Sequence, residues 1–499
     1  MTPARKLALY GGGAALALLV VAALVGIDWR DEQPAPAAPP TARAKPPRTA
    51  RKIQAPEPAA TRWLAIGGGA GPDSNQLSLE SDLALAVEIF EKGGRVLFAG
   101  GPDSEGVQVA ERRDGGDPLL AELASLFAPR AGRNATYRMT KLAAHGPATR
   151  ERVRQELSTL GKAGREPLLV YFASHGDIGS EPARNVVSLW GGGALAADEL
   201  ATLLDDATRP MRLVIAACFS GGFAEMVFRG GYKKGGPAAA DRCGLFSSTW
   251  DLEASGCDPD PDRKSHESYG VYFLHALRGR DRHGKELPRA DVDFDGDGKI
   301  SLAEAHARVR IVSRGIEVPT TTSERWLREV ALPKGSPLAW PEEEAVIAAL
   351  EKKLKADEER ARSELERLDK RVDELSESQD AASSDEQAAY EQTVGELLAR
   401  WPVLDDPWHP DFAATVDAHR DDIEKHLDES AAYRRFRKAG DVAERLEREA
   451  HRAMAERAPY ERLVRALDNR RLAGQLKQKG GPDWQRFEAL RTCERSAPP

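Results

Sequence analysis

Two stretches in the middle of the chain, LLVYFASHGD at residues 168–177 and RLVIAACFSGG at residues 212–222, decide its fold. Each contains an apolar run, which is typical of a strand buried on both faces of a sheet. Each then reaches a reactive side chain, His175 in the first and Cys218 in the second, with glycine close behind. In open parallel sheets, chemistry collects where the strands end. We therefore expect both side chains at one edge of a parallel sheet.

The sequence on either side of these stretches alternates between strand and helix patterns. Such alternation predicts an α/β fold, a mostly parallel sheet covered by helices on both faces, across residues 62–335. The predicted strands lie at 63–66, 95–99, 167–173 and 212–217, and the predicted helices at 79–90, 149–160 and 197–205.

The pair His175 and Cys218 is the main functional signal. A thiol becomes a nucleophile when a neighbouring imidazole takes its proton, and neighbouring strands about 5 Å apart would bring the two side chains together. The backbone N–H groups of Gly176 and Cys218 would then face the oxyanion of a scissile carbonyl. Alone, such a cysteine is usually a small buried hydrophobe and such a histidine a turn residue. Together they predict a cysteine peptidase that acts on a peptide or protein substrate.

The two stretches also resemble the catalytic blocks of legumain-like cysteine peptidases, in particular the bacterial ones, which belong to the caspase-fold clan. The resemblance extends over residues 62–335 and includes 244–257 and 269–273. It implies a caspase-like α/β/α sandwich, with His175 as general acid/base and Cys218 as the nucleophile of an acyl-enzyme. It also implies that the acyl group can pass to an amine, as in a transamidase or ligase.

The chain departs from that family at two positions. Legumains have an acidic residue two places before the nucleophile, where this chain has Ala216, so their specificity for asparagine does not carry over. They also orient the histidine with an asparagine after the first strand. The one candidate here, Asn75, has a poor spacing and is better interpreted as a turn residue. By the resemblance, the candidate substrate-pocket residues are Asp177, Asp251, Glu253 and Ser255.

The chain has four cysteines. Cys243 and Cys257 flank a loop and would form a disulfide in an oxidising compartment, which leaves Cys218 and Cys493 unpaired. Free thiols at both positions are an equal alternative.

Residues 293–304, DFDGDGKISLAE, fit the twelve-residue calcium loop of an EF-hand. Glycine stands at the sixth position and an apolar β-branched residue at the eighth. The predicted ligands of a calcium ion are Asp293, Asp295, Asp297, the Lys299 carbonyl, Ser301 and Glu304. A helix at 302–313 fits the exit from the loop, but no helix directly precedes it, so we expect a single unpaired hand.

The amino terminus predicts a membrane anchor. Arg5 and Lys6 precede an apolar run at residues 7–27, long enough to cross a bilayer as a helix, and no good cleavage site follows. We expect a transmembrane helix within residues 1–27, a Pro/Ala-rich linker at 28–61, and the rest of the protein outside the cytoplasm.

The carboxyl-terminal third, residues 342–499, is densely charged and predicted to be helical. Apolar residues at coiled-coil spacing predict a coiled coil at about 345–378, used either as a hairpin or for self-association. The net charge of −8, without a basic face, argues against a nucleic-acid partner. An alternative to the peptidase is therefore a non-catalytic, calcium-binding membrane scaffold that recruits partners through its coiled coil.

Overall fold

The computed structural model describes residues 54–110, 117–127, 135–257, 267–407 and 409–499. Residues 54–499 form one compact unit. The predicted anchor at residues 1–27, and the linker as far as residue 53, lie outside the described residues. Among the helices of the described ranges, none is long and apolar enough to cross a membrane.

The central sheet has six strands in the described part of the chain, in the order β11-β10-β9-β5-β1-β2. All neighbours run parallel except β11, which is antiparallel to β10. The mostly parallel sheet of the predicted α/β fold is thus confirmed. The strands are β1 Trp63–Gly67, β2 Gly94–Phe98, β5 Leu168–Ala173, β9 Met211–Ala216, β10 Arg242–Phe246 and β11 Thr320–Thr321.

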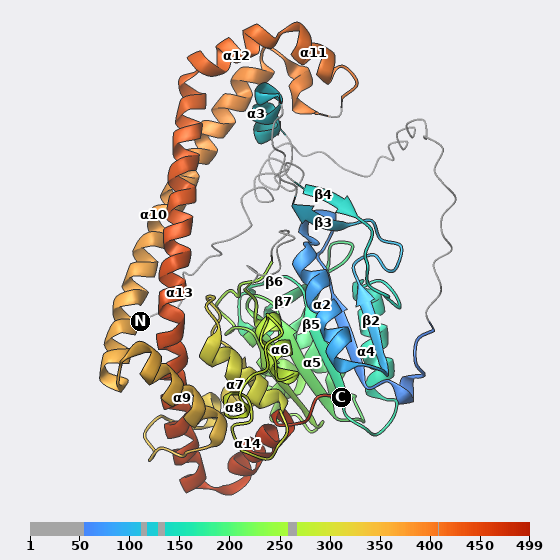
Figure 1. The fold of residues 1–499 in the computed structure, drawn as a ribbon, viewed down its shortest axis with the longest axis vertical. Helices are drawn as coiled ribbons and strands as arrows, with labels where there is room; N and C mark the ends of the chain where they lie inside the picture. Colours follow the sequence, from blue (N-terminus) through green and yellow to red (C-terminus); the bar gives the residue numbers. More distant parts are fainter. Residues whose placement is uncertain (1–53, 111–116, 128–134, 258–266, 408) are drawn as a thin grey trace. The chain divides into compact units, whose positions relative to one another are not determined.

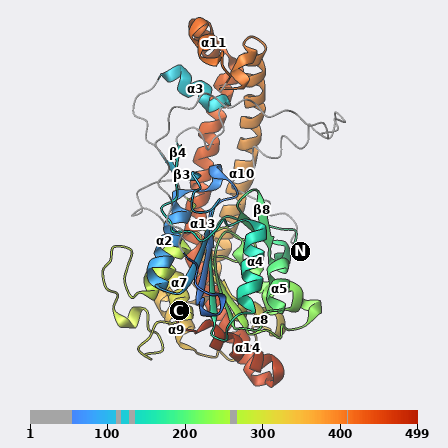
Figure 2. The ribbon, with the colours of Figure 1, turned by 90° about the vertical axis from the view of Figure 1, so that its right-hand side faces the viewer.

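Helices cover both faces of this sheet (Figure 2). Side chains alternate along a strand, so Tyr171 of β5 packs on one side and its neighbour Phe172 on the other. The helices on the first side are α2 Leu77–Phe90, α6 Tyr269–Leu277 and α7 Leu302–Val312, and those on the second are α4 Arg150–Gly161 and α5 Ala197–Asp205.

Two small antiparallel sheets accompany the central one. Strand β6, Gly176–Asp177, begins directly after His175 and pairs with β7, Val186–Leu189, which pairs with β8, Gly193–Ala196. The other small sheet joins β3 Val107–Ala110 to β4 Ala135–Arg138, with helix α3 Pro118–Phe127 between them in the sequence.

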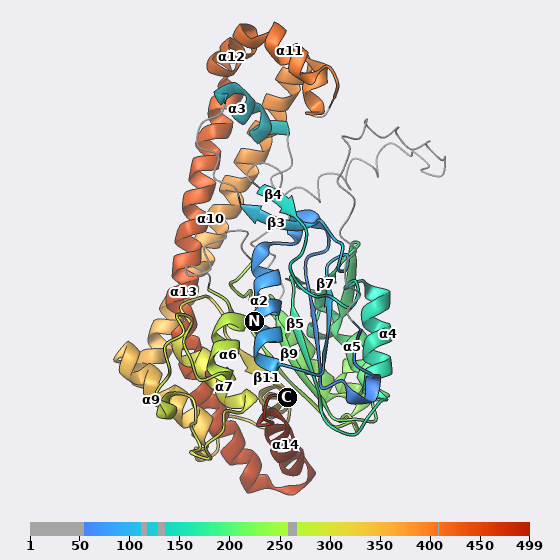
Figure 3. The same ribbon diagram turned by 45° about the vertical axis from the view of Figure 1, so that its right-hand side comes forward.

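The carboxyl-terminal third is helical, as predicted, and its two long helices lie side by side (Figures 1 and 3). Leu375 of one packs on Ala450 and Ala453 of the other, and Tyr390 on Phe436, so the pair is antiparallel. The helices are α8 Thr322–Val330, α9 Pro341–Leu354, α10 Glu358–Leu398, α11 Phe412–Ala418, α12 Arg420–Glu429, α13 Ala431–Lys479 and α14 Gly481–Glu494.

The predicted coiled coil at 345–378 is not one continuous helix. A left-handed residue, Lys355 with φ of 51°, ends α9, and α10 starts afresh at Glu358. From Ala361 onward the apolar stripe of α10 is buried against α13 of the same chain. This is the hairpin alternative, in which the stripe is already covered within one molecule.

The carboxyl-terminal helices share a core with the sheet. Leu476 of α13 and Phe487 of α14 pack with Cys243 of β10 and Trp326 of α8. The segments on both sides of residues 335–342 belong to one compact unit.

The predicted disulfide between Cys243 and Cys257 is wrong, and so is the prediction that Cys493 is unpaired. Cys243 is bonded to Cys493 of α14, with their Cα atoms 6.0 Å apart. Cys243 is buried in β10 and faces the core shared with α14, whereas Cys257 lies exposed in the loop after β10. The sequence offered no way to see that α14 returns to the sheet.

Candidate active site

His175 and Cys218 lie at the same edge of the sheet. Strands β5 and β9 are parallel neighbours, with Ala173 opposite Ala216, and each reactive residue follows two positions later. The two turns are in contact, because a Cβ atom built on Gly176 would lie 2.1 Å from the carbonyl oxygen of Cys218. Only glycine therefore fits next to the nucleophile at this point.

The imidazole of His175 is oriented by the loop before α2. Its Nε2 lies 2.8 Å from the carbonyl oxygen of Ser74 and 2.8 Å from Oε1 of Gln76. A carbonyl oxygen can only accept, so the hydrogen-bond partners assign the proton of the neutral ring to Nε2. The other ring nitrogen, Nδ1, is then the basic atom.

Asn75 holds the loop that carries these partners rather than the histidine itself. Its side chain is buried, accepts from the N–H of Gly69 at 3.1 Å and donates to the carbonyl of Gly106 at 3.0 Å. The interpretation of Asn75 as a turn residue therefore fits its position. Its two neighbours, Ser74 and Gln76, contact the imidazole in place of an orienting asparagine. No pattern in the sequence predicted this role.

Cys218 sits on a sharp turn that several hydrogen bonds maintain. The next residue, Phe219, has a φ of 56°, in the left-handed region that bulky side chains rarely adopt. Such a residue costs of the order of 1–3 kcal/mol and persists where its surroundings enforce it. Here the N–H of Phe219 donates to Leu252 at 2.9 Å, and Asn185 Nδ2 donates to the Phe219 carbonyl at 2.9 Å.

Asn185 joins this turn to the loop after β10. It is fully buried, and its Nδ2 also donates to the carbonyl of Trp250 at 2.6 Å. Its Oδ1 accepts from Gly179. Asn185 is thus a positioning residue that the sequence did not reveal, because a single asparagine before a strand carries no distinctive signal.

The loop after β10 also contacts the thiol itself. The Sγ atom of Cys218 lies 3.4 Å from both the N–H nitrogen and the carbonyl oxygen of Ala254. In the described part of the chain, thiol and imidazole are not hydrogen-bonded to each other. Ala254 therefore covers part of the half-buried thiol.

Burial favours the neutral form of both reactive groups. Burial raises the pKa of the Cys218 thiol well above its usual value, and Cys257, Glu253 and Asp177 add to that shift. Burial also lowers the pKa of His175, against the opposing effects of the Ser74 carbonyl and Asp177. A neutral imidazole is able to take a proton, and a neutral thiol has one to give.

Of the two predicted oxyanion donors, Gly176 has an N–H whose direction follows from the strand pairing. The N–H of Ser188 donates to the carbonyl of His175 at 2.9 Å, so Gly176 and Val187 form a non-hydrogen-bonded pair between β6 and β7. The N–H of Gly176 consequently points away from β7. The other predicted donor, the N–H of Cys218, belongs to the residue directly before the left-handed Phe219.

The four predicted substrate-pocket residues lie in different surroundings. Asp251 lines a cleft next to the site, and Glu253 is half-buried beside the thiol, where burial raises its pKa to about 7. Asp177 is exposed at the end of β6. Ser255 has a structural contact, since its Oγ accepts from the N–H of Ile316 at 3.3 Å.

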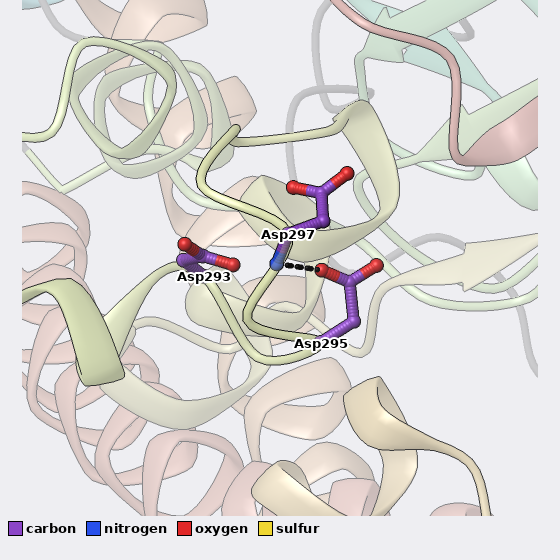
Figure 4. Close-up of side chains that lie close together, drawn as sticks. All are labelled: Asp293, Asp295 and Asp297. Atoms are coloured by element: carbon purple, nitrogen blue, oxygen red, sulfur yellow. Dashed lines mark hydrogen bonds between the residues drawn. The ribbon is translucent and has the colours of Figure 1, made fainter.

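The calcium loop brings its three aspartates together (Figure 4). One oxygen from each of Asp293, Asp295 and Asp297 lies within 4.8 Å of the others. Asp293 is buried, and its Oδ1 has no hydrogen-bond partner. Such an orphaned carboxylate oxygen is costly to bury unless a ligand satisfies it, and hard oxygen donors suit a calcium ion.

Two of the other predicted ligands, Ser301 and Glu304, take part in hydrogen bonds within the loop. Glu304 is buried and caps α7, accepting from Ser301 through Oε2 and from the N–H of Phe294 at 2.7 Å through Oε1. Lys299 is exposed and follows the turn at Gly298. The donor set therefore fits a calcium ion: Asp293 Oδ2 accepts from the N–H of Gly298 and pairs with Arg289, whereas its Oδ1 has no hydrogen-bond partner among the described residues.

Comparison with known proteins adds little to this geometry. No protein-family model matches the sequence, and no curated protein does. Among solved structures, the chain is similar to a crystal structure of caspase-1 from Spodoptera frugiperda, with 14% identity and a TM-score of 0.22. The match covers 46% of this chain and 77% of the caspase chain. A similarity this weak supports no conclusion about activity.

Proposed function

We propose that this protein is a cysteine peptidase, with Cys218 as nucleophile and His175 as general acid/base. The observation that carries the proposal is the meeting of two strand-end turns, in which Gly176 packs against the carbonyl of Cys218. The left-handed Phe219 supports it, because strained residues cluster at functional sites.

The reaction follows from the tautomer of His175. Nδ1 takes the thiol proton, and Sγ attacks the scissile carbonyl carbon, whose oxygen becomes an oxyanion facing the N–H groups of Gly176 and Cys218. The protonated imidazole then gives its proton to the leaving amine as the C–N bond breaks, which leaves a thioester. Water, deprotonated by His175, hydrolyses the thioester and frees Cys218.

Substrate must first displace the loop at Ala254. The thiol favours its protonated form and is half-buried against Ala254, so it should react slowly with small alkylating agents and faster with a peptide-like probe that opens the loop. An amine that enters the opened site in place of water would give the transamidase alternative, which product analysis with an added amine detects.

A labelling experiment tests the proposal. In a Cys257→Ser background, which removes the exposed thiol of the loop, a peptide acyloxymethyl ketone should label Cys218 alone. The variant His175→Ala should lower the labelling rate by about 10²–10⁴-fold, the usual contribution of a general base. A Cys218 that stays inert to every peptide probe, with calcium present, would favour the scaffold alternative.

We also propose that the loop at residues 293–304 binds calcium, supported by the orphaned Oδ1 of Asp293. Calorimetry should show binding to the wild-type chain and none to Asp293→Asn.

The protein is further proposed to be anchored by residues 1–27, with its catalytic part outside the cytoplasm. The disulfide between Cys243 and Cys493 supports that location, because disulfides persist in oxidising compartments. A reporter fused after Pro58 should be active only outside the cytoplasm.

A further inference from the structure

A cleft of about 370 Å³ lies at the edge of the sheet where β9 and β10 end. Its walls come from parts of the chain that are far apart in the sequence. One wall contains Gly221, Trp250 and Asp251, which follow the two strands, and the other contains Glu461 and Arg465 of α13. The carboxyl-terminal helices thus complete a cleft that the sheet alone would leave open.

The cleft is next to the nucleophile. Asp251 belongs to the same loop as Leu252, whose carbonyl accepts from Phe219, and Ala254, which contacts the thiol of Cys218 at 3.4 Å. An extended peptide advances about 3.3–3.6 Å per residue. A substrate whose scissile carbonyl lies at Sγ therefore has the cleft within a few residues of the bond.

The positive charges of the cleft already have partners. Arg325 pairs with Glu225 at 2.6 Å, and Arg328 and Arg465 both pair with Glu324. Among the carboxylates that line the cleft, Glu461 pairs with Arg457.

Asp251 differs from these residues. Its Oδ1 accepts from Thr249 Oγ1 at 2.8 Å, and its charge acts on Arg465 of the same cleft, but among the described residues it forms no ion pair within 4.0 Å. Its carboxylate therefore keeps an acceptor oxygen for a ligand. Trp250, 38% exposed, stands beside it and offers an aromatic face on which a cationic side chain can lie.

We propose that this cleft is the subsite for a basic side chain, lysine or arginine, near the scissile bond, with Asp251 as its counter-ion. The substrates are accordingly peptides or proteins with a basic residue near the cleavage site. This inference rests on the proposed peptidase function for its place in the reaction, but the binding it predicts is measurable without catalysis.

The test compares peptides that differ only in charge. The full-length chain carrying Cys218→Ala is titrated with fluorescent peptides containing either arginine or its neutral isostere citrulline, and binding is followed by anisotropy. We expect the arginine peptide to bind about tenfold more tightly, as a charge-assisted contact in a half-buried cleft allows. Asp251→Asn should remove that difference. Asp206→Asn, which neutralises an exposed carboxylate with a side chain 77% accessible, should keep it.

Each outcome decides a separate point. Equal binding of the two peptides, or a preference that survives Asp251→Asn, overturns the basic subsite. A preference that depends on Asp251, in a chain whose Cys218 is never alkylated by an arginine peptide acyloxymethyl ketone, supports the subsite and contradicts the peptidase. The variant Asp251→Lys should reverse the charge preference and bind a glutamate peptide better than an arginine peptide.

Discussion

At the scale of single residues, the proposed reaction starts from neutral groups. The carbonyl of Ser74 fixes the proton of His175 on Nε2 and so leaves Nδ1 basic. Burial then lowers the pKa of His175 and raises that of Cys218. In the proposed reaction, proton transfer from sulfur to nitrogen would therefore be part of the attack on the substrate, and no stable thiolate–imidazolium pair would form beforehand.

This arrangement predicts the pH dependence of acylation. Only the neutral imidazole acts as a base, and its pKa is lowered, so activity should persist below the ordinary histidine value of 6.5 and fall only as the pH drops through the shifted pKa. The rate of inactivation by a peptide ketone, measured across the acid range, checks this. Alkylation of the free enzyme by iodoacetamide should instead keep rising at alkaline pH, because the thiol pKa is raised. An acid limb above 6.5 would contradict the assignment.

At the scale of elements, the calcium loop is connected to the end of the chain. Arg495, just after α14, forms ion pairs with Asp295 of the loop and with Glu342 of α9. The carbonyl of Ser496 accepts from the N–H of Leu302, the first residue of α7, at 3.0 Å. The arginine thus holds a carboxylate that a calcium ion would need.

Removal of that arginine should strengthen calcium binding. Arg495→Gln frees Asp295, and the expected gain is about two- to fivefold in affinity, since a partly exposed ion pair contributes up to about 1 kcal/mol. Calorimetric titration with calcium measures it. Lys479→Gln, which removes one positive charge from an exposed pair with Asp483, is the matched control. An unchanged affinity in Arg495→Gln would show that the arginine does not compete.

At the scale of the whole molecule, the carboxyl-terminal helices are part of the protein's core. Arg462 of α13 is buried and donates to carbonyls in the segment between α7 and β11, including those of Glu317 at 2.7 Å and Gly315 at 2.9 Å. Glu494 of α14 accepts from Thr322 and Ser323 at the start of α8. A fragment that ended at residue 335 would leave these buried groups without partners.

The disulfide should further stabilise the contact between the sheet and the carboxyl-terminal helices. It joins Cys243 to Cys493 across a sequence separation of 250 residues, and loss of a bond that closes so long a loop typically costs about 2–5 kcal/mol. Cys493→Ser should therefore lower the free energy of unfolding by that amount, as measured by denaturant titration, and reduction of the wild type should have the same effect. Cys257→Ser should leave the unfolding curve in place. Equal stability of Cys493→Ser and wild type would contradict a structural role for the bond.

Much of this protein is determined by local pattern. The apolar runs before His175 and Cys218 define buried parallel strands, and once those strands are neighbours the two side chains share an edge. The calcium loop is likewise local, because a span of consecutive residues supplies all its candidate ligands. Periodicity and spacing act within a few turns of chain, so the sequence alone determines these features.

Contacts between distant segments were decided only by the tertiary structure. The bond of Cys243 with Cys493, the orientation of His175 by Ser74 and Gln76, and the wall that α13 adds to the cleft all join residues far apart in the chain. Composition and spacing do not encode which surface a returning helix covers. That choice depends on the shape and charge of both partners, which exist only after the sheet and the helices have packed.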